Sequence, residues 1–313
     1  MTLLWILFSL LAALFLPGLG LLKYTFGRRP LPDVYDPDAL RKSHWAQYDH
    51  IPKCLPWFRA HPPRDWHVAS YDGSILHGSF FPCEAPRGTI IQFHGYRSRY
   101  EVDFSVSIPF YQSLGFHLLL VDQRGNNRSG GRFITFGVKE RLDVLSWVTY
   151  TAMKLGPDHP IYLSGLSMGA TTVCMASDLE FPGNVRGILA DCGFTSPHEI
   201  LCHIIQNRYH LPPRPVVAFL NLFTNLFAGF SLYEWSTVDA LKNARYPVIL
   251  FHGLEDDFVP PWMSRKSFEA CTGEASLHEF PGAGHGLSYL ADTPRYQQLL
   301  REFLEGHLPE VTP

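Results

Sequence analysis

Short strand-like runs bounded by turn residues constrain the fold of this 313-residue chain more than any other feature. They cover residues 66–71, 75–81, 89–93, 117–121, 161–163, 185–190, 248–251 and 275–280. The first two flank the turn Asp72-Gly73 and predict a hairpin. Most of the others are apolar throughout, which is typical of strands buried on both faces of a parallel sheet.

Helical patterns alternate with these runs. Apolar residues recur at three- and four-residue steps from Val138 to Ala152 and mark one face of a helix, and residues 167–179 and 294–304 also favour helices. Alternation after a hairpin predicts an α/β fold: a doubly wound, mostly parallel sheet with helices on both faces. Residues 194–241 interrupt the alternation and predict an inserted helical cap. The Phe and Leu side chains of the cap would pack on the domain, line an acyl pocket as a lid, or do both.

The composition excludes several classes of protein. Apolar residues make up 46% of the chain and charged residues 18%, which excludes wholesale disorder. The net charge is −3 and no block rich in Lys and Arg is present, so a nucleic-acid surface has no electrostatic support. The six cysteines are widely spread without a CxxC pair, which favours buried thiols over a disulfide framework or a zinc site.

The segment Leu3–Leu22 carries no charged residue. As a helix it would be ~30 Å long, which matches the hydrocarbon core of a bilayer. A cleaved signal peptide is one alternative, but a basic leading region and a small-residue cleavage site are missing. A core helix of a soluble domain is the other alternative. We predict an uncleaved transmembrane helix that anchors the protein.

Basic residues follow the predicted anchor and indicate its orientation in the membrane. They are Lys23, Arg28, Arg29, Arg41 and Lys42. This bias favours a single-pass protein of the cell membrane whose long C-terminal part lies on the cytoplasmic side. We expect an anchor at residues 1–23, a linker packed on the core at 24–64, and a main domain at 65–313 with the cap at 194–241.

The run Gly165-Leu166-Ser167-Met168-Gly169 connects a predicted strand to a predicted helix. The glycines permit a tight turn, which forces the serine into a strained backbone conformation and lifts its oxygen clear of the sheet. An ordinary helix-capping serine is the alternative. The context favours Ser167 as a nucleophile, and the helix N-terminus favours negative charge that develops beside it.

A serine hydroxyl needs an adjacent base, and the base needs an acid that fixes its tautomer. His285 lies in a glycine turn after the last predicted strand, which suits the base. Asp256 or Asp257 follows the strand at 248–251 and suits the acid. Along the chain these residues follow the order serine, aspartate, histidine. Triads whose serine lies in a strand-to-helix turn have the same order.

Two backbone N–H groups are expected to hold an oxyanion. One belongs to Met168, directly after the nucleophile. The other belongs to Tyr96, in the loop after the strand at 89–93. We expect His94, in the same loop, to shape the loop rather than to react.

Together these motifs resemble the α/β-hydrolase superfamily over residues 66–308, and within it the membrane-anchored bacterial serine hydrolases of the esterase and acyl-peptidase-like branch. The resemblance selects Asp256 over Asp257, because only Asp256 fits the frame His-Gly-x-x-Asp-x-x-Val-Pro. It implies structural turns at Asp122 and Asp191, and neither a metal nor an organic cofactor. The motifs that carry it are His94–Tyr96, Asp122–Gly130, Gly165–Gly169, His252–Pro260 and Gly284–Gly286.

The resemblance implies a serine hydrolase that cleaves carboxylic esters through Ser167, His285, Asp256 and an acyl-enzyme. The expected substrate is a small-molecule or lipid-like acyl ester. A peptidase or amidase and an acyltransferase would use the same triad, so both remain open. A non-catalytic, membrane-tethered binding protein is a further alternative, although all three triad residues are in place.

Overall fold

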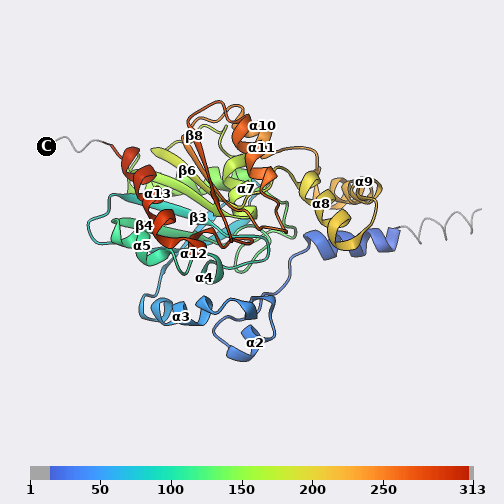
Figure 1. The fold of residues 1–313 in the computed structure, drawn as a ribbon, viewed down its shortest axis with the longest axis horizontal. Helices are drawn as coiled ribbons and strands as arrows, with labels where there is room; N and C mark the ends of the chain where they lie inside the picture. The colour runs from blue at the N-terminus through green and yellow to red at the C-terminus, as the bar shows by residue number, and fades with distance from the viewer. Residues whose placement is uncertain (1–14, 310–313) are drawn as a thin grey trace, which may run out of the picture.

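The computed structural model describes residues 15–309, which contain one eight-stranded sheet in the order β1-β2-β4-β3-β5-β6-β7-β8 (Figure 1). β2 pairs antiparallel with β1 and β4, and the other pairs are parallel. Each predicted run forms a strand, so the mostly parallel sheet is confirmed. The bounds are β1 Arg64–Ala69, β2 Ile75–Phe81, β3 Gly88–Phe93, β4 Phe116–Val121, β5 Ile161–Leu166, β6 Val185–Asp191, β7 Val248–Gly253 and β8 Ala275–Phe280.

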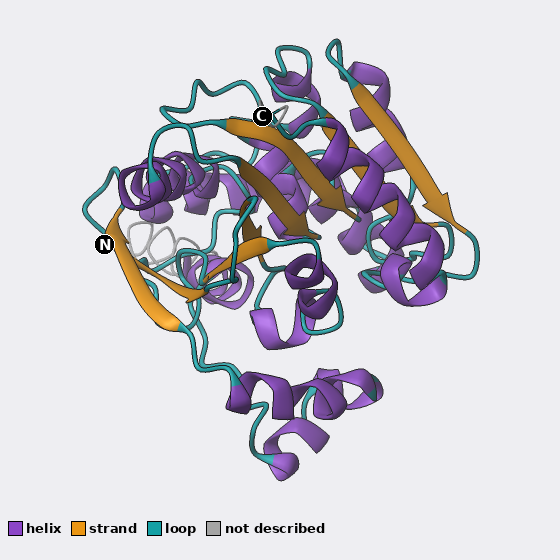
Figure 2. Ribbon diagram, turned by 90° about the vertical axis from the view of Figure 1, so that its left-hand side faces the viewer, coloured by secondary structure: helices purple, strands orange, loops and turns teal. Residues whose placement is uncertain are grey.

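Helices cover both faces of the sheet (Figure 2). One face packs against α6 and α7, and the other against α5 and α13. Residues 15–26 are also helical. The remaining bounds are α2 Pro37–Arg41, η1 His44–Gln47, α3 His50–Ala60, α4 Tyr100–Asp103, α5 Ile108–Ser113, α6 Glu140–Leu155, α7 Met168–Met175, α8 Pro197–Tyr209, α9 Pro213–Phe223, the π-helix η2 Thr224–Ala228, α10 Thr237–Leu241, α11 Trp262–Ala270, α12 Ser288–Ala291 and α13 Thr293–Gly306.

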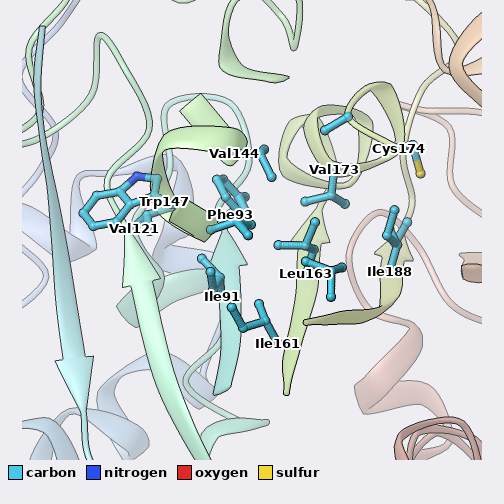
Figure 3. Packing of buried hydrophobic residues seen from close by; sticks show 14 of the residues in the cluster. Ile91, Phe93, Val121, Val144, Trp147, Ile161, Leu163, Val173, Cys174 and Ile188 are labelled. Carbon is cyan, nitrogen blue, oxygen red and sulfur yellow. The ribbon is translucent and has the colours of Figure 1, made fainter. Parts of the chain in front are cut away.

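The two apolar cores explain why the central strands are apolar throughout. Ile91 of β3 and Leu163 of β5 pack with Val173 of α7 and Trp147 of α6 on one face (Figure 3). Ile90, the neighbour of Ile91, faces the opposite core, and both are fully buried. Because successive residues of a strand point to opposite faces, a strand covered on both faces has no polar side.

The strand order reverses beside β3, which lies between β4 and β5. Connections that leave the carboxyl ends of these strands diverge and open a crevice, where ligands bind in folds of this kind. The loop that begins at His94 follows β3, and the turn that contains Ser167 follows β5. The topology therefore brings two predicted parts of the site to one place.

Residues 197–241 form α8, α9, η2 and α10, and α9 lies beside helical residues 15–26 (Figure 1). The contact is close, because a Cβ on Gly18 would lie 2.1 Å from the Phe223 ring. Of the two roles expected for the Phe and Leu side chains of the cap, the structure shows packing and not the lining of an acyl pocket. None of residues 216–230 lines the cavity beside Ser167, because the buried side chains of α9 join a separate core with Phe26 and Phe136.

The predicted transmembrane helix lies largely outside the described residues, which begin at Phe15. Between residues 15 and 309, no helix combines the length and the apolar character that crossing a bilayer requires. The predicted linker contains α2, η1 and α3, whose apolar side chains form a small core together with Val102. The expected boundaries of anchor, linker and main domain stay predictions.

Candidate active site

Ser167 occupies the turn between β5 and α7 with φ 54° and ψ −116°. A positive φ is rare for a residue with a side chain and is held here by packing. A Cβ on Gly169 would lie 1.7 Å from the carbonyl oxygen of Phe93, so only glycine fits there. The Ser167 N–H also donates to the carbonyl of Asp191 at 2.8 Å. The strained turn that the motif predicted is therefore present.

The three side chains of the predicted triad meet at hydrogen-bond distance. His285 Nε2 lies 2.9 Å from Ser167 Oγ, and His285 Nδ1 lies 2.7 Å from Asp256 Oδ2. Phe258 packs edge-on against the imidazole with 5.0 Å between ring centroids. With the proton on Nδ1, the ring donates to Asp256 and accepts from the serine hydroxyl. This arrangement allows a histidine to act as general base for a serine.

The Asp256 carboxylate is buried and held from several sides. Its Oδ1 accepts from the N–H groups of Phe258 at 3.0 Å and Val259 at 2.8 Å. Its Oδ2 also lies 3.4 Å from His252 Nε2. Burial alone would raise the pKa of Asp256, but the contacts with His252 and His285 outweigh burial and lower the pKa to about 2. Asp256 is therefore ionised at neutral pH and favours the Nδ1–H tautomer of His285.

The loop after β3 lies directly against the nucleophile. A Cβ on Gly95 would lie 3.5 Å from the Ser167 Cβ. The Gly95 N–H donates to Asp103 Oδ2, and the Ser98 hydroxyl donates to Asp103 Oδ1, both at 2.6 Å. Asp103, at the end of α4, thus holds the loop in place. The sequence does not single out this residue, because nothing local distinguishes it from other acidic residues of a short helix.

Tyr96 and Met168 were expected to supply the oxyanion-hole N–H groups. Within residues 15–309, neither N–H donates a hydrogen bond to another protein group. The side chain of Tyr96 is fixed by its hydroxyl, which donates to the carbonyl of Thr25 at 2.7 Å, and by its ring against Phe136. Both N–H groups thus lack a protein acceptor in the described residues, which the predicted oxyanion hole requires.

The residues expected to shape loops make fixed hydrogen bonds. His94 is fully buried, and its Nδ1 lies 2.7 Å from the Gly95 carbonyl while its Nε2 accepts from the Gln123 N–H at 3.1 Å. Both ring nitrogens are occupied, so His94 has none free for proton transfer. Asp122 and Asp191 were expected in structural turns, and both accept hydrogen bonds from side chains. Asp122 accepts from Asn127 and Arg128, and Asp191 accepts from Ser288 and Tyr296.

Cys192 is a neighbour of the triad that no sequence motif indicates. Its Sγ and the ligand atoms of Asp256 and His285 all lie within 4.8 Å of one another, a spacing that a metal ion could bridge. Burial raises the pKa of the Cys192 thiol well above its usual value, which disfavours the thiolate that a metal needs. The cluster therefore fits a packed thiol beside the triad better than a metal site.

A cavity of about 570 Å³ opens beside Ser167 and His285. Part of its wall comes from the segment around η1, which contributes His44, Trp45 and Tyr48. This segment belongs to the predicted linker packed on the core, and its concentration of His, Trp and Tyr was a signal for a role in the site. The other apolar and aromatic lining residues include Val102, Phe104, Tyr111, Leu166, Leu189 and Tyr289.

Comparisons place the chain among known proteins. The model of the alpha/beta hydrolase family matches residues 75–296. YqkD from Bacillus subtilis is 26% identical over 196 residues, covering 63% of this chain and 64% of YqkD. Lysophosphatidylserine lipase ABHD12 from Rattus norvegicus is 24% identical over 236 residues, covering 71% of this chain and 56% of the lipase. The match therefore spans less than two thirds of either relative.

A solved structure with a similar fold is the Pyrococcus furiosus esterase Pf2001. It superposes with a TM-score of 0.65 at 21% sequence identity. The superposition covers 81% of this chain and 94% of the esterase. At this identity the likeness concerns the fold.

Proposed function

The chain belongs to the alpha/beta hydrolase family, and we propose that within this family it is a serine hydrolase that cleaves carboxylic esters. One observation carries the proposal: His285 lies 2.9 Å from the Ser167 hydroxyl on one side and 2.7 Å from the Asp256 carboxylate on the other. A buried, ionised acid, an oriented imidazole and a serine in a strained turn together form an activated nucleophile.

The proposed reaction proceeds through an acyl-enzyme. Ser167 Oγ attacks the carbonyl carbon of the ester while His285 Nε2 takes the hydroxyl proton. The N–H groups of Tyr96 and Met168 stabilise the oxyanion. The tetrahedral intermediate then collapses, and the alcohol leaves with the proton from His285. Water, activated by the same imidazole, releases the carboxylic acid and restores the serine.

The cavity supports an acyl ester with an extended apolar part as the substrate. Its volume of about 570 Å³ and its lining of aromatic and aliphatic side chains suit such a group. The lipase name of the ABHD12 relatives adds support for a lipid-like ester. Amide cleavage and acyl transfer to another acceptor use the same residues, so a substrate panel has to separate them.

The first experiment is labelling of the full chain with a fluorophosphonate, which reacts with activated serines. We expect labelling of the wild type and none of the Ser167→Ala variant. Ser107 lines the same cavity, and its hydroxyl donates to the Phe104 carbonyl at 3.1 Å, so Ser107→Ala should still label. If both variants still label, the reactive serine is another one. No labelling of the wild type would favour the binding-protein alternative.

A substrate panel follows. p-Nitrophenyl esters of increasing chain length are compared with aminoacyl anilides, and both are repeated with Ser167→Ala. We expect ester hydrolysis that the variant lacks, with a rate reduction of at least ~10³-fold. Cleavage of the anilides alone would replace the esterase assignment with a peptidase or amidase.

Membrane attachment through the N-terminal apolar segment is part of the proposal. The charge-free sequence Leu3–Leu22 supports attachment, and the basic residues from Lys23 to Lys42 support a cytoplasmic catalytic domain. Protease digestion of intact and of opened cells tests on which side of the membrane the catalytic domain lies. Digestion of the domain in intact cells would contradict the cytoplasmic orientation.

A further inference from the structure

α9 and helical residues 15–26 lie side by side (Figure 1). Exposed large apolar side chains belong to both segments and to η2, which follows α9. Phe15 joins the two segments, since its ring centroid lies 5.8 Å from that of Phe223 and 5.7 Å from that of Phe227. A contiguous exposed apolar surface marks an interaction site, whereas single exposed residues do not. The surface, named the cap face here, consists of Phe15, Leu16, Leu222, Leu226 and Phe227, each between 42% and 68% exposed.

After Arg214, the helices α9 and η2, which carry Leu222, Leu226 and Phe227 of the cap face, lack charged residues on their buried and their exposed sides. Residues 215–233 contain no Asp, Glu, Lys, Arg or His. Val217 and Leu220 are buried against the cap core, while Ala218 and Leu222 on the other side are exposed. A surface helix of a water-surrounded domain normally carries charges on its outer side. After Arg214, α9 therefore has the composition of a helix whose outer side is also covered.

The chain that precedes the described residues indicates what covers this face. Residues 3–14 contain no charged side chain and directly precede Phe15, a member of the cap face. The following turns belong to the cap contact, because Leu22 is 3% exposed and Gly18 lies against the Phe223 ring. As a helix, residues 3–14 would measure ~18 Å, well short of the ~30 Å of bilayer hydrocarbon. A charge-free sequence that adjoins the cap face supports an apolar phase as the partner of this face.

We propose that a lipid bilayer covers the cap face, with α9 and η2 lying in the membrane interface. Binding of this kind gains free energy in proportion to the apolar area that leaves water. Lys23 and Tyr24 follow Phe15 by eight and nine residues, ~12–14 Å along the helix, where basic and aromatic side chains meet lipid headgroups. Tyr24 also lines the catalytic cavity, so this orientation opens the cavity towards the membrane surface.

The experiment reads lipid contact directly and is independent of hydrolysis. A diazirine amino acid is incorporated at position 226 of the full chain. The protein is then bound to phosphatidylcholine vesicles and irradiated. Met153 on α6 is 79% exposed and belongs to another surface, so the same amino acid at position 153 is the matched control. We expect phospholipid adducts at position 226 and at least ~10-fold fewer at position 153, with the same result in a Ser167→Ala background.

Cross-links from position 226 to the same chain or to a second copy, without lipid adducts, would overturn the proposal. A second measurement uses Leu222→Gln/Leu226→Gln, whose sites are exposed and tolerate polar residues. We expect its partitioning into vesicles to fall at least ~10-fold, because two leucines no longer leave water on binding. Met153→Gln should partition like the wild type. Unchanged partitioning of the double variant would assign all membrane contact to residues 3–14 and overturn the role of the cap face.

Discussion

At the scale of single residues, the site depends on groups whose environment restricts them to one role. Ser167 is held at a positive φ because Gly169 lets α7 approach the carbonyl of Phe93. Asp256 is held ionised because hydrogen-bond donors surround a buried carboxylate. Asp257, its neighbour, is exposed and does not reach the imidazole. The difference between two adjacent aspartates is therefore one of burial and direction.

This difference predicts the effect of two matched substitutions. Asp256→Asn removes the charge that stabilises protonated His285 and its tautomer, so kcat for a p-nitrophenyl ester should fall about 10³- to 10⁴-fold. Asp257→Asn should stay within about twofold of the wild type. With a pKa of about 2, Asp256 stays ionised above pH 4, so the loss should persist from pH 5 to pH 9. Equal effects of the two substitutions would contradict the assignment.

His117 predicts a pH dependence of folding. Burial, with smaller contributions from His159 and Arg64, lowers the pKa of His117 to about 4 from the usual 6.5, and its Nδ1 accepts from the Cys83 N–H at 2.8 Å. The unfolded chain therefore takes up this proton first, so stability present above pH 6.5 is lost as the pH falls towards 4. The lowered pKa thus makes the fold less stable in acid than near neutral pH.

Urea unfolding at pH 7 and pH 4.5 measures this contribution. The His117→Gln variant keeps an acceptor for the Cys83 N–H but cannot titrate, so its stability should fall less than that of the wild type between the two pH values. Parallel losses in the two proteins would assign the acid sensitivity to other groups.

At the scale of elements, short connections rather than long helices position the reacting groups. The loop after β3 is held by Asp103 of the four-residue helix α4, through Gly95 and Ser98. The loop after β7 carries Asp256, and the loop after β8 carries His285. The strands fix where each loop begins, and local hydrogen bonds fix the direction of its N–H and side-chain groups.

Asp103 is the residue that tests this arrangement. Asp103→Ala leaves the Gly95 N–H without its acceptor, and the loop should shift the Tyr96 N–H away from the oxyanion. We expect kcat to fall about 10- to 100-fold with little change in KM, and stability to fall by about 1–3 kcal/mol. Asp103→Asn keeps an acceptor oxygen and should remain within about tenfold of the wild type. Identical kinetics of the two variants would show that the hydrogen bond to Gly95 does not position the loop.

At the scale of the whole molecule, segments that are far apart in sequence build one cavity. Residues 44–50 close it from the N-terminal side, the sheet supplies Leu166 and Leu189, and residues 285–296 close it from the C-terminal side. The small core around Val34, Ile51 and Val102 ties the first of these segments to α4. The segment expected to be a linker is therefore part of the substrate wall.

Substitution of Tyr48 tests this wall. Tyr48→Ala should enlarge the cavity and raise kcat/KM for long esters relative to short ones, about fourfold for each further methylene that becomes buried. A series of p-nitrophenyl esters measures the shift. Tyr233→Ala, at a 53% exposed residue that does not line the cavity, should leave the chain-length profile unchanged. An unchanged profile in Tyr48→Ala would remove residues 44–50 from the acyl-binding region.

The sequence by itself determined the features that depend on local patterns. The parallel sheet follows from apolar runs that must be buried on two faces, and Ser167 follows from a glycine turn between a strand and a helix. The choice between Asp256 and Asp257 needed a family frame, because both follow the same strand. Only the tertiary structure decided that Asp103 fastens the oxyanion loop, that residues 44–50 line the cavity, and that α9 packs on residues 15–26 instead of over Ser167. Contacts between distant segments depend on how elements pack, and packing leaves no periodic trace in the sequence.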